Sequence, residues 1–263
     1  MGQNLNVART MFPRITSQSC ANPLVANDLV LDEAGSIRVI YAPFDHIEMQ
    51  AKLVVVGITP GMNQAVNALR AGLEARISGN SLENCLKTAK LTASFSGGGI
   101  RNNLVSMLDA IGVARLFGVS TTAAIFQPGS TCVHFTSALR YPVFVNGKNY
   151  NGAPDILTTP ILRRQIDTHL VEEAKLLGDA VWLPLGPKAE LAVSHLAEQG
   201  LLDQRRILTG LPHPSGANAE RIAVFLGRKK PEEASRQTRP APLLAAFTRL
   251  QSQIDALGKG EAA

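Results

Sequence analysis

The chain has 263 residues, of which 45% are hydrophobic and 18% are charged, and this ordinary globular composition excludes a largely disordered protein and a coiled-coil rod. Its apolar runs, such as Leu53–Val56, are far shorter than the roughly 20 residues of a membrane span, and its N-terminal part has no signal-like apolar core. We therefore expect a cytoplasmic protein with no membrane association, and the length fits one generous α/β domain or two small ones.

The three cysteines, Cys20, Cys85 and Cys132, lie far apart and form no Cys-x-x-Cys pair. This spacing suits neither a disulfide framework nor a zinc or iron–sulfur site, so we expect reduced, mostly buried thiols and no metal cluster. The formal net charge is +5, and residues 201–239 alone contain eight basic and four acidic side chains. A nucleic-acid surface and a solvated basic tail both account for this late concentration of positive charge.

Short β-rich apolar runs alternate with helical patterns along the chain. We predict strands at residues 37–41, 52–56, 131–136, 180–185 and 206–211. The second of these contains the run LVVV at residues 53–56, which is apolar throughout, as in a central strand covered on both faces. We predict helices at residues 66–77, 100–111, 160–177, 187–199 and 218–226. The stretch Tyr141–Pro154, which contains Asn-Gly twice, is predicted to be a loop, and Thr159 is predicted to cap the helix that begins at Pro160.

This alternation predicts an α/β fold with three layers, α/β/α, around a central, mostly parallel sheet of four to five strands. We assign residues 1–227 to this domain and residues 228–263 to a basic linker followed by a C-terminal amphipathic helix. Apolar residues recur at helical spacing in that helix, at Leu243, Phe247, Leu250, Ile254 and Leu257. We expect this stripe to dock on its own domain, and binding to a partner protein is the alternative.

Two loops that follow predicted strands have residue types suited to chemistry, because ligands of an open parallel sheet bind beyond the carboxyl ends of its strands. The first loop, Gly57–Asn63, has two glycines that permit close backbone approach and precedes a helix start. The second, Leu211–Asn218, holds His213 between two prolines, which restricts the backbone that carries the imidazole. The first loop lacks the spacing of a dinucleotide or nucleoside-triphosphate loop. A tight connection and a proline-rich turn are the plain structural alternatives.

Taken together, the two loops resemble the motifs of the uracil-DNA glycosylase superfamily, closest in pattern to its mismatch-specific and single-strand-selective branches. GITPG resembles the GINPG turn of the mismatch-specific branch, and LPHPSGAN resembles the HPSP and NPSG versions of the second motif. Further landmarks occur in the family's order between these loops: Ser94-Phe95 with Ile100–Asn103, His134–Ser137, and Trp182–Pro187. The resemblance covers roughly residues 52–226, so residues 1–227 are expected to be a glycosylase-like domain.

The resemblance implies an enzyme that flips a base out of DNA and hydrolyses its N-glycosidic bond, with no cofactor. It implies that His213 is catalytic, as a hydrogen-bond donor held at the carbonyl oxygen of the departing base. It assigns base binding to Gly57, Ile58, Pro60, Gly61, Met62, Phe95, Thr136 and Ser137. It assigns contacts with the DNA strand to Asn63, Ser215, Gly216, Ala217, Asn218 and Arg221. The expected partner is double- or single-stranded DNA, bound by a monomer.

The sequence departs from the family's pattern at two positions. Relatives have Asp, Asn or Glu where this chain has Thr59, so Thr59 is expected to hold the attacking water without acting as a base. Asp155 is a spare carboxylate in the later loop. Many relatives read the base edge with Asn where this chain has Thr136 and Ser137, whose small hydroxyl groups leave more room. We therefore expect a pyrimidine other than plain uracil, such as a bulky modified phage-type cytosine.

Other functions stay open from the sequence. A non-catalytic or single-turnover nucleic-acid-binding protein with the same fold would also lack a water-orienting carboxylate at Thr59. An ordinary uracil-DNA glycosylase of base excision repair would share both motifs. A nucleotide or nucleoside hydrolase would use the same edge of the sheet. The remaining histidines that we considered, His46, His169 and His195, are expected to be structural or surface residues without carboxylate companions.

Overall fold

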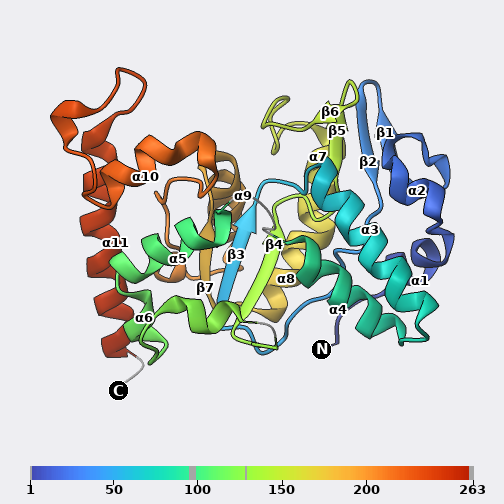
Figure 1. Ribbon diagram of the computed structural model, residues 1–263, viewed down its shortest axis with the longest axis horizontal. Helices are drawn as coiled ribbons and strands as arrows, with labels where there is room; N and C mark the ends of the chain where they lie inside the picture. The colour runs from blue at the N-terminus through green and yellow to red at the C-terminus, as the bar shows by residue number, and fades with distance from the viewer. Residues whose placement is uncertain (1, 95–98, 128, 261–263) are drawn as a thin grey trace. The chain divides into compact units, whose positions relative to one another are not determined.

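Two β-sheets, one parallel and one antiparallel, form in the computed structural model, which describes residues 2–94, 99–127 and 129–260 (Figure 1). The chain divides into two compact units. The first unit consists of Met1–Met49, Val56–Ser96 and Phe135–Gly178, and the second of Gln50–Val55, Gly97–His134 and Asp179–Ala263. The boundary between the units passes through two strands of the parallel sheet.

The parallel sheet has three strands in the order β4-β3-β7, which are Val133–Ser137, Leu53–Gly57 and Val181–Pro184. All five residues of β3 are buried, which confirms the prediction of a central strand. The predicted strand at residues 206–211 is wrong, because only Ile207 forms an isolated parallel bridge, to Trp182. The N–H of Leu208 donates to the Trp182 carbonyl at 2.8 Å, but the carbonyls of Arg205 and Ile207 accept hydrogen bonds from the Gln253 side chain, at 2.8 and 2.9 Å, in place of a continued strand ladder.

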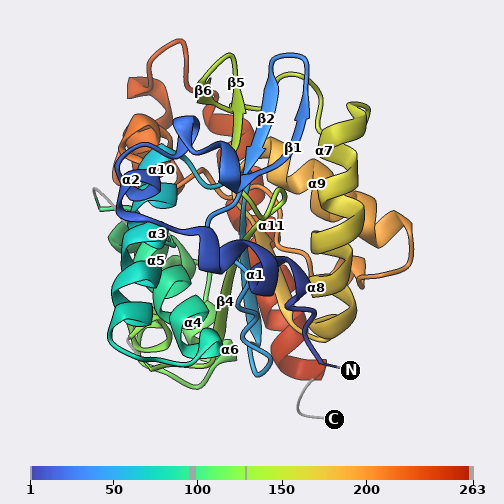
Figure 2. The same cartoon turned by 90° about the vertical axis from the view of Figure 1, so that its right-hand side faces the viewer.

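The antiparallel sheet lies in the first unit and has the order β1-β2-β5-β6 (Figure 2). Its strands are Val30–Ala34, Ile37–Ile40, Val143–Val145 and Lys148–Asn149. The prediction of a loop at Tyr141–Pro154 is therefore wrong. Asn146 and Gly147 have φ values of 50° and 71°, as a tight hairpin turn between β5 and β6 requires. The expected single sheet of four to five strands is corrected to these two sheets.

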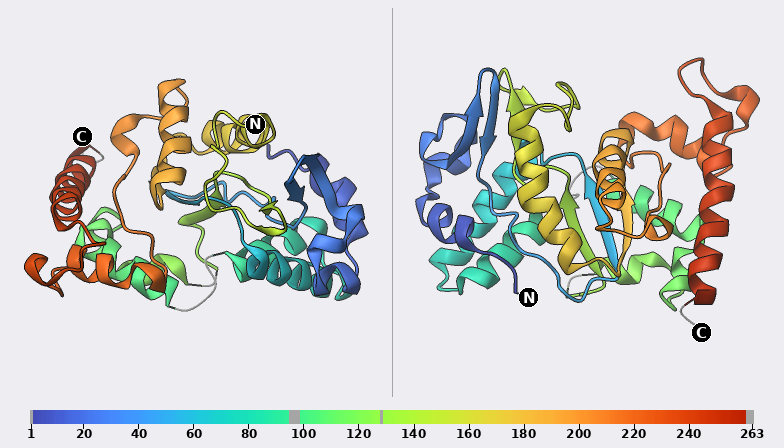
Figure 3. Two further views of the ribbon diagram at one scale, coloured as in Figure 1. Left: turned by 90° about the horizontal axis from the view of Figure 1, so that it is seen from above. Right: turned by 180° about the vertical axis from the view of Figure 1, so that it is seen from behind.

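The helices of the first unit include one closely packed pair and one continuous rod. They are α1 (Asn6–Met11), α2 (Ser17–Ala21), α3 (Met62–Ile77), α4 (Leu82–Ala93), α7 (Pro160–Gln165) and α8 (Val171–Leu176). Helix α3 packs on α4 through a face of small residues, whereas Ile77 of the predicted stripe is exposed. A π-helical turn, Ile166–Leu170, joins α7 to α8 in one rod, seen from behind in Figure 3. Pro160 begins α7 as predicted, but Thr159 makes no side-chain cap.

The second unit contains α5 (Ile100–Ala110), α6 (Val113–Leu116), α9 (Pro187–Glu198), α10 (Ala219–Phe225) and α11 (Pro240–Gly260). Helix α11 packs on α10 and α6, with Leu250 and Ile254 fully buried (Figure 1). The ring of Phe247 lies edge-on against Phe225, with 5.2 Å between the ring centroids. The apolar stripe of the C-terminal helix therefore faces its own unit. Among the helices that the structure describes, none is long and apolar enough to cross a membrane.

Leu250 on α11 should be a stability determinant of the second unit. Its side chain has no exposed surface, so Leu250→Ala should lower the free energy of unfolding by about 2–5 kcal/mol through lost burial and a residual cavity. Leu244 on the same helix is 38% exposed, and Leu244→Ala should change stability by less than about 0.5 kcal/mol. Urea unfolding measures both, and equal effects would contradict the docked position of α11.

Candidate functional site

The loop after β3 is fixed by backbone hydrogen bonds to the segment that follows β4. The Gly57 carbonyl accepts the N–H of Ala138 at 2.8 Å, and the Ile58 carbonyl accepts the N–H of Leu139 at 3.0 Å. Gly57 and Pro60 are buried, and Ile58 is half-buried. The first loop therefore has a defined backbone position, as the wall of a binding site requires.

The Thr59 hydroxyl extends the same connection. It donates to the carbonyl of Tyr141 at 3.1 Å and accepts the N–H of Val143 at 3.2 Å. A hydroxyl has one proton and two lone pairs, so one lone pair of Thr59 remains for another donor. Thr59 thus joins the first loop to the strand β5, and the prediction that it also holds a water stays a prediction.

The start of α3 is capped by a side chain from the hairpin of β5 and β6. Asn149 Oδ1 accepts the N–H of Met62 at 2.9 Å, while the N–H of Gly61 donates to Oε1 of Gln64 at 2.9 Å. A Cβ atom at Gly61 would lie 3.3 Å from Nδ2 of Asn149, so glycine leaves room for this amide. Asn63 follows as an exposed residue in the first turn. Two of the N–H groups expected to face an anion are therefore already hydrogen-bonded.

The end of β4 provides a buried hydroxyl with no partner among the described residues. Thr136 is 6% exposed, and its Oγ1 has no hydrogen bond to any atom that the structure describes. Ser137, the next residue, is half-buried. A buried hydroxyl without a partner is costly in a folded protein, so Thr136 is a candidate contact for a ligand. Phe95, the predicted stacking residue, lies outside the described residues.

His213, in the second loop, is half-buried, and burial lowers the pKa of its imidazole. The N–H of Ser215 donates to Nδ1 of His213 at 3.3 Å. Because a backbone N–H only donates, Nδ1 must be the unprotonated nitrogen, and the neutral ring carries its proton on Nε2. The imidazole is thus held as a neutral group with one N–H donor at Nε2.

The residues after His213 form a turn that continues into α10. The Asn218 side chain donates to Oγ of Ser215 at 3.2 Å and accepts from Arg221 at 3.0 Å, and Arg221 is exposed. Gly216 and Ala217 are exposed in the same turn, so neither presents a bulky side chain. Asn103 on α5 donates to the Pro214 carbonyl at 2.9 Å. Sequence reasoning quoted Asn103 as a landmark but missed this positioning role.

The structure thus brings the predicted site residues together in two groups. Gly57 to Asn63 lie with Thr136 and Ser137 in the first unit, and His213 to Arg221 lie in the second unit.

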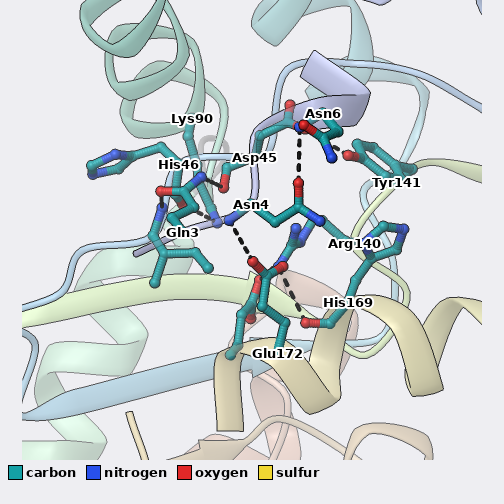
Figure 4. A network of polar contacts seen from close by, with 12 residues as sticks. Gln3, Asn4, Asn6, Asp45, His46, Lys90, Arg140, Tyr141, His169 and Glu172 are labelled. Carbon is teal, nitrogen blue, oxygen red and sulfur yellow. Dashed lines mark hydrogen bonds and ion pairs between the residues drawn. The ribbon is translucent and has the colours of Figure 1, made fainter. Parts of the chain in front are cut away.

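Behind the first loop, the first unit contains a buried polar network that sequence reasoning did not find (Figure 4). Asp45 is 1% exposed and accepts hydrogen bonds from the hydroxyls of Tyr41 and Tyr141, at 3.0 and 2.5 Å. Burial raises the pKa of Asp45, although these hydroxyl bonds favour its ionised form. No sequence motif signals the network, because its members come from separate elements.

Arg140 joins the same network to α8. Its guanidinium lies 2.8 Å from the carboxylate of Glu173 and 3.1 Å from that of Glu172, and it donates to the His169 carbonyl at 3.1 Å. The ring of Tyr141 packs edge-on against His169, with 5.0 Å between the centroids. Burial, with the nearby charge of Arg140, lowers the pKa of His169 to about 3. Arg140 and Tyr141 therefore anchor the segment to which the first loop is bonded.

The N-terminal segment covers this network (Figure 4). Gln3 bonds the backbone of Asp45 and Ile47, and the N–H of Asn4 donates to Glu172 at 2.8 Å. Lys90, which is 2% exposed, donates to the His46 carbonyl at 2.7 Å, and burial lowers the pKa of this lysine to about 8.

Two expectations about histidines are corrected. His46 Nε2 lies 3.7 Å from Glu48, and His195 Nδ1 lies 3.9 Å from Glu198, so both do have carboxylate companions. No group of three or more His, Cys, Asp or Glu side chains able to hold a metal ion occurs among the described residues. The cysteines that the structure describes are free thiols, two of them buried and Cys132 half-buried.

The basic residues late in the chain are partly paired. Arg205 forms an ion pair with Asp203 at 2.7 Å. Both residues, with Arg206 and Arg249, line a groove of about 700 Å³ beside α11. Glu220 of α10 accepts hydrogen bonds from three residues of the expected linker, Lys229, Ser235 and Thr238, the one from Lys229 measuring 2.7 Å. The segment after α10 is therefore bonded back to α10 and is no free tail.

Comparison with curated proteins finds a relative in Bacillus subtilis (strain 168) that is 35% identical over 236 residues, which is 89% of this chain and 91% of the relative. Its name is "Uncharacterized protein YoxB". No protein-family profile matches the chain. No solved structure matches it.

The buried pair of Arg140 and Glu173 should dominate the stability of the network. Glu173→Gln leaves a buried guanidinium undercompensated and should lower the free energy of unfolding by about 3 kcal/mol. Glu172 contacts the same guanidinium but its side chain is 20% exposed, so Glu172→Gln should cost less than about 1 kcal/mol. Chemical denaturation at neutral pH compares the two, and equal costs would show that burial does not set the difference.

His169 should make stability fall in acid. Its pKa is about 3 in the folded chain and 6.5 in the unfolded chain, so below pH 6.5 only the unfolded state gains this proton. The free energy of unfolding of the unmodified protein should therefore fall between pH 7 and pH 5. In the His169→Phe variant this fall should be smaller by about 2 kcal/mol. Phenylalanine keeps the edge-on contact with Tyr141. Parallel stability curves for the two proteins would contradict a neutral buried imidazole.

Proposed function

The chain belongs to the same family as YoxB, and from its own residues we propose that it is a monofunctional DNA glycosylase of the cytoplasm. The enzyme flips a damaged or modified base out of DNA and hydrolyses its N-glycosidic bond, leaving an abasic site. Its two loops resemble those of the uracil-DNA glycosylase superfamily.

The observation that carries this proposal is the state of His213. Cleavage of an N-glycosidic bond leaves negative charge on the departing base, and a fixed donor at its carbonyl oxygen stabilises that charge. The hydrogen bond from Ser215 to Nδ1 keeps the donor proton on Nε2, and burial favours the neutral ring. Pro212, Pro214 and the Asn103 contact restrict the loop, so little reorganisation accompanies the reaction.

The first loop supports the base-binding half of the proposal. Its backbone, from Gly57 to Met62, is bonded to neighbouring segments, so it can act as a wall of defined shape. Thr136 supplies a buried hydroxyl that lacks a partner among the described residues and can bond the edge of a base. Thr136 and Ser137 are small, so we propose a pyrimidine larger than uracil, such as a substituted phage-type cytosine, as the preferred base.

DNA is the proposed partner, bound by a monomer without a metal or other cofactor. The residues that precede α10, Ser215, Gly216, Ala217 and Asn218, are exposed or half-buried, and Arg221 adds an exposed positive charge one turn later. Groups of this kind hold phosphates beside a lesion without reading sequence.

A non-catalytic or single-turnover DNA-binding protein is the second candidate, and one observation favours it. The hydroxyl of Thr59 is bonded to the backbone at Tyr141 and Val143, and Asp155 Oδ1 accepts from the N–H groups of Leu157 and Thr158. Neither Thr59 nor Asp155 is therefore identified as the base that activates the attacking water. Attack by that water then depends on the positive charge that develops on the sugar.

Oligonucleotides with uracil, thymine mispairs, hypoxanthine or modified cytosines test the proposal, with base release measured by alkaline cleavage under single-turnover conditions. His213→Ala should lower the rate constant on the best substrate about 10²- to 10³-fold while leaving DNA binding nearly unchanged. His195→Ala on α9 is the matched control and should keep the rate.

Each outcome separates the candidates. Release that is unchanged in His213→Ala would remove His213 from the mechanism, and DNA binding without release from any substrate would favour the binding protein. Efficient release of uracil alone would indicate an ordinary uracil-DNA glycosylase and contradict the larger base. Activity on free nucleosides would indicate a nucleoside hydrolase.

A further inference from the structure

We propose that Asn149 is a substrate-contacting residue of this site, whose side-chain amide donates a hydrogen bond to an acceptor atom of the flipped base. The inference rests on the proposed function and extends it, because no sequence motif includes Asn149. The substrate class that follows is a base with a carbonyl oxygen or an unprotonated ring nitrogen on the edge that meets the first loop.

The orientation of the amide is fixed by one hydrogen bond. Oδ1 of Asn149 accepts the N–H of Met62 at 2.9 Å, which leaves Nδ2 as the other end of the planar group. Nδ2 lies beside Gly61, at 3.3 Å from the position that a Cβ atom would take there. A side chain at Gly61 would press on this amide, so the glycine and the asparagine form one local arrangement.

The amide nitrogen Nδ2 of Asn149 can donate hydrogen bonds but cannot accept them. It carries two N–H groups, the Asn149 side chain is exposed, and none of the described residues accepts from Nδ2. An acceptor atom of a ligand therefore suits this position, whereas an amino group of a base does not. The two hydroxyls at the end of β4, Thr136 and Ser137, provide no amide, so Asn149 adds a kind of contact that they lack.

The hairpin that carries Asn149 is held from both ends. Asn149 pairs with Phe144 of β5, and β5 pairs with β2 in the antiparallel sheet. Val143 is bonded to the Thr59 hydroxyl, and the tight turn at Asn146 and Gly147 fixes the register of the two strands. The donor is thus attached to a sheet and to the first loop at once, as a reader of base identity requires.

A phosphate oxygen is also a hydrogen-bond acceptor, so the experiment must separate a base from a phosphate. Asn149→Asp keeps an oxygen for the N–H of Met62 but has no N–H group, and Asn149→Ala removes the donor without adding charge. Asn151→Asp is the matched control, because it adds the same charge two residues away at an exposed position.

The readouts are single-turnover base release, binding to an undamaged oligonucleotide of the same sequence across a salt series, and the thermal midpoint. We expect Asn149→Asp and Asn149→Ala to release the preferred base at least about 10-fold more slowly than Asn151→Asp. Binding to undamaged DNA should match that control, and the Asp variant should keep the thermal midpoint because α3 remains capped.

Three results would overturn the inference. Equal release by Asn149→Asp and Asn151→Asp in an active enzyme would leave Asn149 as a helix cap only, while the proposed function stands. Weaker binding of Asn149→Ala to undamaged DNA, with an unchanged salt slope because the lost amide carries no charge, would assign the contact to phosphate. Absence of base release by the unmodified protein would instead overturn the proposed function, and this inference with it.

Discussion

The structure of the first unit depends on the burial of two neighbouring residues, Arg140 and Tyr141. The guanidinium of one and the hydroxyl of the other both need polar partners inside the protein. A buried guanidinium is stable only with opposed carboxylates, and Glu173 and Glu172 of α8 provide them. The Tyr141 hydroxyl is likewise satisfied by Asp45. These contacts hold the segment whose backbone bonds to the loop after β3, so the shape of a candidate binding wall depends on charges that are largely buried.

The two loops achieve rigidity by different means. The loop after β3 is bonded to the segment after β4, to β5 and, through Asn149, to β6, so its neighbours in space hold it. The loop with His213 is held mainly by its own prolines and by the Ser215 N–H, with Asn103 as the outside support. Base excision needs a wall for a planar ring, which the loop after β3 can provide, and a hydrogen-bond donor, which His213 can provide. We favour that chemistry for this reason.

The positive charge of the chain also has a clearer distribution. Lys229 is paired with Glu220 of α10, and Arg205 is paired with Asp203, so part of the basic stretch is compensated within the second unit. Arg221 remains exposed on α10, directly after the His213 loop, with one contact to Asn218. The proposal of a phosphate contact therefore rests on the local charge of Arg221 beside this loop and not on the net charge of +5.

The sequence by itself determined the buried strand β3, most helices of the chain and the two loops with chemistry, because periodicity, prolines and glycines act locally. It missed α4, whose buried face includes Lys90, and it placed a loop where β5 and β6 form. Only the tertiary structure decided the division into two sheets, the network around Asp45 and Arg140, and the cap that Asn149 provides. Those features join residues far apart in the chain, and their energy comes from burial and hydrogen bonding that no local pattern encodes.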